Sequence, residues 1–178
     1  MIILLVGMPG SGKEEFKKIA ETMGWNVVSM GDVVREYTIS LGLEMNEKNV
    51  GELASKERKE HGMDIWARRT LEKIVSKKTI IDGVRNIEEV EFFKRNLGKD
   101  ISIVAILSSQ KNRYERILKR GRKDDIKNFS QFIERENREL SWGLGNLIAL
   151  ADYFIVNEGT IEQYKENVRS FLESFKDC

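Results

Sequence analysis

The sequence predicts an α/β fold in which helices cover both faces of a parallel sheet. Short apolar runs alternate with amphipathic stretches along all 178 residues, and this alternation is typical of repeated strand–helix units. Residues 2–6 form an unbroken apolar run that is too short for a helix, and a glycine-rich turn follows it. An all-apolar strand of this kind indicates a parallel sheet that is buried on both faces.

The remaining elements follow from the same patterns. Strands are expected at residues 2–6, 27–29, 79–82, 101–107 and 153–156. Apolar side chains at helical spacing predict helices around residues 16–23, 33–41, 67–75, 87–97, 114–118, 129–140, 144–151 and 161–175. Thr160 stands where it can cap the last helix.

The turn after the first strand carries one continuous motif, Gly7, Met8, Pro9, Gly10, Ser11, Gly12 and Lys13. Glycines allow backbone N–H groups to turn inward around an anion, and the following helix presents the positive end of its dipole. A lysine at the end of the motif supplies a point charge for the β- and γ-phosphates. The alternative to a phosphate-binding site is an ordinary glycine turn between a strand and a helix, but such a turn does not require the lysine. We therefore expect a phosphate-binding loop (P-loop) that binds ATP.

The motif departs from its usual pattern directly after Lys13. Ser or Thr, whose hydroxyl holds Mg²⁺, is expected at the next position, and the chain has Glu14 followed by Glu15. Acidic side chains suit the first turn of a helix because of its dipole, but they repel phosphate oxygens. Either they face solvent and Mg²⁺ is held through water, or one carboxylate helps to hold the metal. The sequence leaves both alternatives open.

Composition limits the class of protein and its partners. The chain has 30 basic and 29 acidic residues, so no net field favours nucleic acid or a membrane surface. The single cysteine, Cys178, leaves no disulfide framework and no thiolate metal site. No apolar run approaches the roughly 20 residues of a membrane span, and the N-terminus is a strand of the fold without a basic leader. We expect a soluble, cytoplasmic protein.

Two polar segments without strands follow strand ends, where α/β sheets place their ligands. They span about 31–77 and about 119–139, and we interpret them as lids rather than as simple surface helices. Asp82 ends an apolar strand and could hold Mg²⁺ through its waters. Arg35 and Arg85 also follow strand ends and could grip an anion.

These motifs resemble, in order and spacing, those of adenylate kinase and related nucleoside monophosphate kinases. The resemblance rests on the glycine motif, on the Gly31-Asp32-x-x-Arg35 segment and on the Asp82-Gly83-x-Arg85 segment. Residues 151–159 (ADYFIVNEG) look like the end of dephospho-CoA kinases. As a whole the chain is most similar to a largely archaeal family of adenylate-kinase-related P-loop kinases.

The resemblance implies roles for individual residues. Lys13 and the loop, including Glu14, would hold ATP, with Asp82 on the water shell of Mg²⁺ and with Asp32, Arg35 and Arg85 on the acceptor. Further basic residues would meet the adenine and the phosphates of ATP or close the lid; they are Arg116, Arg120, Arg135 and Arg138, with the run Arg122-Lys123-Asp124-Asp125. The lid lacks cysteines, so it holds no zinc. Because the acceptor phosphate is already ionised, a general base is not needed, and His61 is interpreted as a solvated helix end.

We therefore expect a P-loop NTPase fold, with a five-stranded parallel sheet of order 2-3-1-4-5 like that of nucleoside monophosphate kinases. One domain is predicted over residues 1–178, with its core at 1–30, 78–118 and 140–178, an acceptor-binding insertion at about 31–77 and a lid at about 119–139. The expected activity is transfer of the γ-phosphoryl group of ATP, with Mg²⁺, to a small nucleotide such as AMP. The alternatives are a dephospho-CoA-type kinase with Asp32 as base, and a nucleotide-gated binding protein with little turnover. The oligomeric state stays open.

Overall fold

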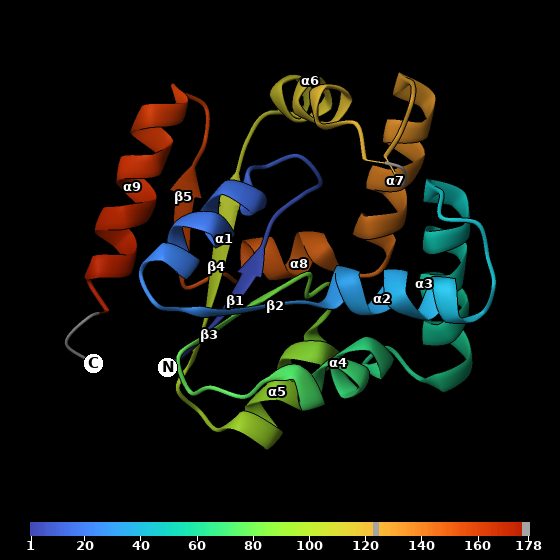
Figure 1. Ribbon diagram of the computed structural model, residues 1–178, viewed down its shortest axis with the longest axis horizontal. Helices are drawn as coiled ribbons and strands as arrows, with labels where there is room; N and C mark the ends of the chain where they lie inside the picture. The colour runs from blue at the N-terminus through green and yellow to red at the C-terminus, as the bar shows by residue number, and fades with distance from the viewer. Residues whose placement is uncertain (123–124, 176–178) are drawn as a thin grey trace.

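The computed structural model describes residues 1–122 and 125–175, and its centre is a five-stranded sheet (Figure 1). The strands are β1 (Ile2–Val6), β2 (Asn26–Ser29), β3 (Thr79–Asp82), β4 (Ile101–Leu107) and β5 (Tyr153–Val156). Every pairing is parallel, and the order across the sheet is β2-β3-β1-β4-β5. The predicted fold class and strand order are confirmed. Three positions named above, Lys123, Asp124 and Cys178, lie outside the described residues.

Helices connect the strands and cover both faces of the sheet. They are α1 (Lys13–Thr22), α2 (Met30–Ser40), α3 (Glu47–His61), α4 (Ile65–Thr70) with the 3₁₀ turn Leu71–Lys73, α5 (Ile87–Leu97), α6 (Gln110–Arg120), α7 (Phe129–Ser141), α8 (Leu144–Ala149) and α9 (Ile161–Glu173). Thr160 caps α9 as predicted: its side chain accepts a hydrogen bond from the Gln163 backbone N–H, and the Gln163 side chain accepts one from the Thr160 backbone N–H.

Two helical expectations differ from the structure. The helix expected to run to residue 75 ends earlier, because Ile74 is already extended and Val75 is 83% exposed. The helix α3 was not predicted as an element of its own. Its sequence is mostly charged, and only a short apolar face, with Leu53 and Ala54 buried, packs against the rest of the protein. The apolar periodicity is therefore too sparse to reveal it.

Side chains that alternate along the strands pack into two separate hydrophobic cores, one on each face of the sheet. On β1, Ile2, Leu4 and Val6 pack into a cluster with α2, α3, α4, α5 and α8, whereas Ile3 and Leu5 pack into a cluster with α1 and α9. This two-sided burial explains why β1 is apolar at every position. Figure 1 shows α1 and α9 together on one side of the sheet.

The carboxyl ends of the strands lie at one edge of the sheet, and the polar segments gather there. A third, small cluster joins α6 to α7 through Ile117, Ile126 and Phe132. Figure 1 shows α6 beyond this edge, with α7 beside α3. The division into core, insertion and lid stays a prediction. Within the described part of the chain, no helix is long and apolar enough to cross a membrane.

Candidate active site

The glycine motif forms a tight loop between β1 and α1 that leaves no room for side chains at two positions. Gly10 and Gly12 adopt positive φ values of 80° and 115°. A Cβ on Gly10 would lie 2.5 Å from the Arg113 carbonyl oxygen, and one on Gly12 would lie 2.2 Å from Asn157 Nδ2. Gly12 is also the N-cap of α1 and offers no side-chain hydrogen bond to it. The first N–H groups of α1 therefore remain available to an anion.

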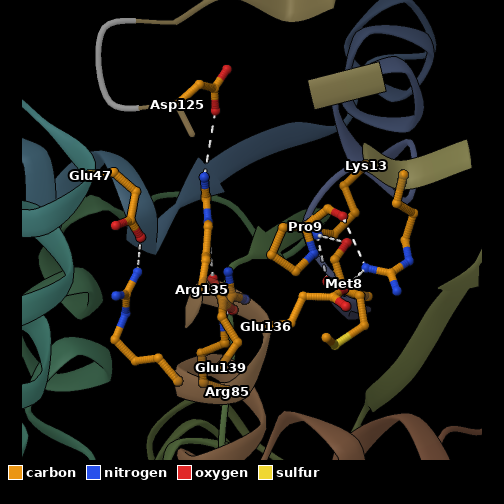
Figure 2. Close-up of polar contacts among 12 residues, drawn as sticks. Met8, Pro9, Lys13, Glu47, Arg85, Asp125, Arg135, Glu136 and Glu139 are labelled. Atoms are coloured by element: carbon orange, nitrogen blue, oxygen red, sulfur yellow. Dashed lines mark hydrogen bonds and ion pairs between the residues drawn. The ribbon is translucent and has the colours of Figure 1, made fainter. Parts of the chain in front are cut away.

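Lys13 folds back over this loop. Its ammonium Nζ donates to the Gly7 carbonyl at 2.6 Å and to the Met8 carbonyl at 3.4 Å (Figure 2). Burial lowers the pKa of Lys13 to about 8, although the nearby Asp82 carboxylate acts in the opposite direction. No carboxylate of residues 1–122 or 125–175 is in direct contact with the Lys13 ammonium. A bound anion, such as a phosphate, would stabilise a buried cation of this kind.

Asp82 lies at the end of β3, beside the loop. Its Oδ2 is 3.0 Å from Lys17 Nζ, and its buried Oδ1 has no hydrogen-bond partner among the described residues. Burial raises the pKa of Asp82, but Lys17, Lys13 and Arg85 outweigh burial and hold that pKa below its usual value, so the carboxylate is ionised. An ionised oxygen with an open lone pair suits the water shell of a hard cation such as Mg²⁺.

The two glutamates that follow Lys13 both engage basic side chains. Glu14 lies 2.9 Å from Lys17 and 2.9 Å from Arg122, which belongs to the segment after α6. Glu15 lies 3.2 Å from Lys165 on α9. Neither carboxylate is simply solvated, and Glu14 connects the start of α1 to the segment between α6 and α7.

Arg85 follows β3 and lies across the edge of the sheet from Lys13. Its guanidinium forms an ion pair with Glu139 of α7; the Glu139 side chain is buried, and that of Arg85 is 15% exposed. Burial raises the pKa of Glu139, but Arg85 and Arg135 outweigh burial and hold it below its usual value. Arg135 Nε lies 3.9 Å from Glu139 and its Nη1 lies 3.5 Å from Asp125 (Figure 2). Burial lowers the pKa of Arg135 because it removes water from the charged guanidinium. A bound anion would stabilise that charge.

The segment between α6 and α7 is held by Asp125. Arg120 binds its carboxylate in bidentate fashion, with Nε 2.9 Å from Oδ2, and the Arg122 N–H donates to the same oxygen at 3.0 Å. Arg116, one turn before Arg120, donates to the Asn157 carbonyl at 2.9 Å. Basic side chains from α6 and α7 therefore face the P-loop and are fixed by a carboxylate or a carbonyl.

A crevice of about 450 Å³ joins these groups. The predicted residues that line it are Pro9, Gly10, Ser11, Gly12, Lys13, Glu14, Arg35, Asp82, Arg85, Arg116, Arg120 and Arg135. Arg138 instead lines a second, adjoining pocket between α3 and α7. Asp32 forms an ion pair with Arg35, and its side chain is 59% exposed. His61, at the end of α3, is half exposed, as expected of a solvated helix end.

Comparison with known proteins assigns the family. The UPF0200 protein of Thermoplasma volcanium is 52% identical over 172 residues, which cover 96% of each chain, and the UPF0200 protein of Thermoplasma acidophilum is 47% identical over 96% of this chain and 94% of its own. The chain belongs to the UPF0200 family. The family model described as an AAA domain also matches residues 6–132 of this UPF0200 protein.

Solved structures agree on the fold. The shikimate kinase from Bacteroides thetaiotaomicron superposes with a TM-score of 0.64 over 99% of the UPF0200 chain and 98% of its own, at 15% identity. TT1252 from Thermus thermophilus has the same TM-score and coverage at 14% identity. At such identity the likeness shows the fold alone, which is a P-loop kinase-like fold.

Several residues that shape the site of the UPF0200 protein escaped sequence analysis. Asn157 Nδ2 donates to the Ser11 carbonyl at 2.8 Å, and Tyr164 Oη donates to the Gly12 carbonyl at 3.0 Å, so the two side chains support the P-loop from β5 and α9. Arg113 forms a buried ion pair with Glu136. Asn157 belongs to the run 151–159, which was singled out above, whereas no local pattern distinguishes the other three residues from packing or surface positions.

Proposed function

We propose that this UPF0200 protein is a nucleotide kinase that transfers the γ-phosphoryl group of ATP to a nucleoside monophosphate. The crevice carries the proposal. It is lined by Lys13 and the P-loop, by Asp82, and by Arg35 and Arg85. Two anion-binding ends in one crevice suit a reaction between two phosphate-bearing molecules.

The donor end suits a triphosphate. The N–H groups at the start of α1 and the Lys13 ammonium would hold the β- and γ-phosphates. Arg116 and Arg120 come from α6 at the same end of the crevice. Arg120 and Arg135 would turn from Asp125 towards the transferring group and neutralise its charge.

The residues present fit Mg²⁺, which fold relatives of this kind generally use with ATP. The fit rests on Asp82. Its carboxylate is ionised and buried, and one of its oxygens has no partner among the described residues. Asp82 would hold the ion through its waters, with Glu14 as the neighbouring carboxylate. Mg²⁺ would neutralise charge on the donor phosphates.

The acceptor end would position the attacking group. Arg85 and Arg35 would bind the acceptor phosphate, one oxygen of which attacks the γ-phosphorus while the bond to the β–γ bridging oxygen breaks and ADP leaves. The acceptor oxygen is already ionised at neutral pH, so positioning and charge neutralisation replace a general base. The segments that contain α3 and α7 would exclude water, which would otherwise take the phosphoryl group.

The test is a panel of acceptors in the presence of ATP and Mg²⁺. Nucleoside monophosphates, matched nucleosides and dephospho-CoA are compared by the rate of ADP release. We expect a monophosphate to raise the rate at least 10-fold over hydrolysis in water and its matched nucleoside to have no effect. Stimulation by dephospho-CoA alone would favour transfer to a hydroxyl group. ATP binding without stimulation by any acceptor would contradict the kinase proposal and favour a nucleotide-gated binding protein.

A further inference from the structure

A second pocket continues the crevice on its acceptor side. It encloses about 90 Å³, which is room for several waters or for one planar ring. Gly31, Arg35, Gly83, Arg85 and Arg135 line both cavities, so the pocket opens beside the proposed site of the acceptor phosphate. The remaining wall comes mostly from α2, α3 and α7.

Arg58 of α3 forms part of this wall, and its side chain is 4% exposed. Its Nη2 donates to Glu89 Oε1 at 3.0 Å, so its charge is paired. Its Nε and Nη1 are buried and have no hydrogen-bond partner among the residues that the structure describes. Arg58 Cζ lies over the Trp142 ring, 4.3 Å from its centre. A buried N–H group without a partner has lost its hydrogen bond to water, and a ligand oxygen that accepts from it would restore one.

Arg138 of α7 repeats this arrangement on the same pocket. Its Nη2 forms an ion pair with Glu47, whereas its buried Nε has no partner in the described part of the chain. Gly51 allows it to lie against α3, because a Cβ on that glycine would be 2.4 Å from Arg138 Cζ. The pocket is therefore lined by two arginines whose charges are already paired, and each keeps at least one buried N–H group without a partner among the described residues.

This chemistry limits what the pocket can receive. Because Glu89 and Glu47 already pair with the two arginines, the open donors call for a neutral oxygen rather than a second anion. Trp66 and Trp142, with Met30, Val34, Val50 and Ala54, give the pocket an apolar and aromatic lining that suits a flat ring. An exocyclic amino group would bring N–H groups against N–H groups and would leave both unpaired.

We propose that this pocket binds the base of the acceptor nucleotide and selects bases that carry a carbonyl oxygen, in place of an amino group, at position 6 of a purine or position 4 of a pyrimidine. This oxygen accepts hydrogen bonds from Arg58 and Arg138. The inference rests on the proposed function for the position of the acceptor. It goes further by naming oxo bases, such as hypoxanthine and uracil, over amino bases, such as adenine and cytosine.

Matched nucleotide pairs test the selection without turnover. Equilibrium binding of IMP is compared with that of AMP, and UMP with CMP, by calorimetry in the presence of a non-hydrolysable ATP analogue and Mg²⁺. Within each pair an oxo group replaces an amino group on the same ring. We expect the oxo member to bind about 10- to 100-fold more tightly, as for hydrogen bonds from charged donors.

The variant Arg58→Lys keeps the charge opposite Glu89 and removes the guanidinium donors. We expect its IMP-to-AMP affinity ratio to fall to within about 3-fold of one. The matched control is Arg69→Lys. Arg69 is also paired with a glutamate, has a buried Nη1 without a partner among the described residues and stacks on Trp66 at 4.9 Å, but it is not among the residues that line the pocket. The control should keep the full preference, and thermal melting confirms that both variants are folded.

The outcomes separate this inference from the kinase proposal. Equal or tighter binding of AMP and CMP would overturn the inference, even if phosphoryl transfer is found. Loss of the preference in Arg69→Lys as well would also overturn it, because the effect would not come from the pocket. An oxo preference that depends on Arg58, without transfer to any acceptor, would support the pocket and contradict the kinase.

Discussion

Replacing Lys13 with methionine is expected to abolish turnover and to weaken ATP binding while the fold is kept. The Lys13 ammonium contacts only loop carbonyls among the described residues, at 2.6 and 3.4 Å, and forms no direct ion pair there. Its removal therefore leaves no buried carboxylate without its partner. Loss of a charged hydrogen bond to phosphate costs about 1.5–3 kcal/mol, roughly 10- to 100-fold in affinity. Loss of its charge in the transition state costs about a further 100- to 1,000-fold in rate.

Calorimetric titration of ATP and steady-state turnover measure these effects, and Lys18→Met, an exposed lysine on the same helix, is the control. The wild type supplies a second readout, because the pKa of Lys13 in the free protein is about 8. Above that pH Lys13 is mostly neutral, so ATP binding is accompanied by uptake of a proton from the solvent and the affinity for ATP falls. Proton uptake at pH 9 should vanish in Lys13→Met. Equal ATP affinity and turnover in variant and wild type would refute the P-loop assignment.

Removing Arg85 is expected to weaken binding of the acceptor nucleotide and to leave the affinity for ATP unchanged. A buried charged contact to the acceptor phosphate is worth about 2–5 kcal/mol, or roughly 30- to 5,000-fold in affinity. Arg85→Ala alone would leave Glu139 buried beside a lost partner, at a cost of about 3–5 kcal/mol in stability. The double variant Arg85→Met/Glu139→Gln removes both charges together and is the better test.

Glu139→Gln alone is the control for this pair, since it keeps Arg85. Arg35→Ala, which removes the other arginine assigned to the acceptor, should also weaken acceptor binding and leave the affinity for ATP unchanged. Affinities for ATP and for a monophosphate are measured separately by calorimetry. If the double variant loses ATP affinity as much as acceptor affinity, Arg85 belongs to the donor site and the assignment of the two ends is wrong.

The sheet could be predicted well because each strand is marked by a short continuous pattern in the sequence. The strand β1 is apolar at every position because both of its faces are buried, and Asp82 stands at the last position of β3, where the strand leaves the core. The P-loop could be located in the same way, since glycines and a lysine between a strand and a helix form one continuous pattern. Helix α3 was missed because its buried face is short and its other faces are charged.

The partners of the charged side chains could not be predicted. Arg138 has its partner Glu47 at a distance of 91 residues along the chain, and Arg58 has its partner Glu89 at a distance of 31 residues. Such pairs depend on how helices from different segments meet, which no local pattern records. For the same reason the sequence did not reveal that Arg138, on α7 within the predicted lid segment, lines the second pocket beside Trp142; its role in closing the lid stays a prediction.

The central claim is that phosphate passes from ATP to a second nucleotide within one crevice. The most direct measurement uses ATP labelled with ³²P in its γ-phosphoryl group, incubated with Mg²⁺, a nucleoside monophosphate and the wild-type protein, with Lys13→Met in parallel. Our account predicts that the label appears in the nucleoside diphosphate made from the acceptor, and that none is transferred by the variant. Label found only as free phosphate, at a rate that no acceptor changes, would contradict it.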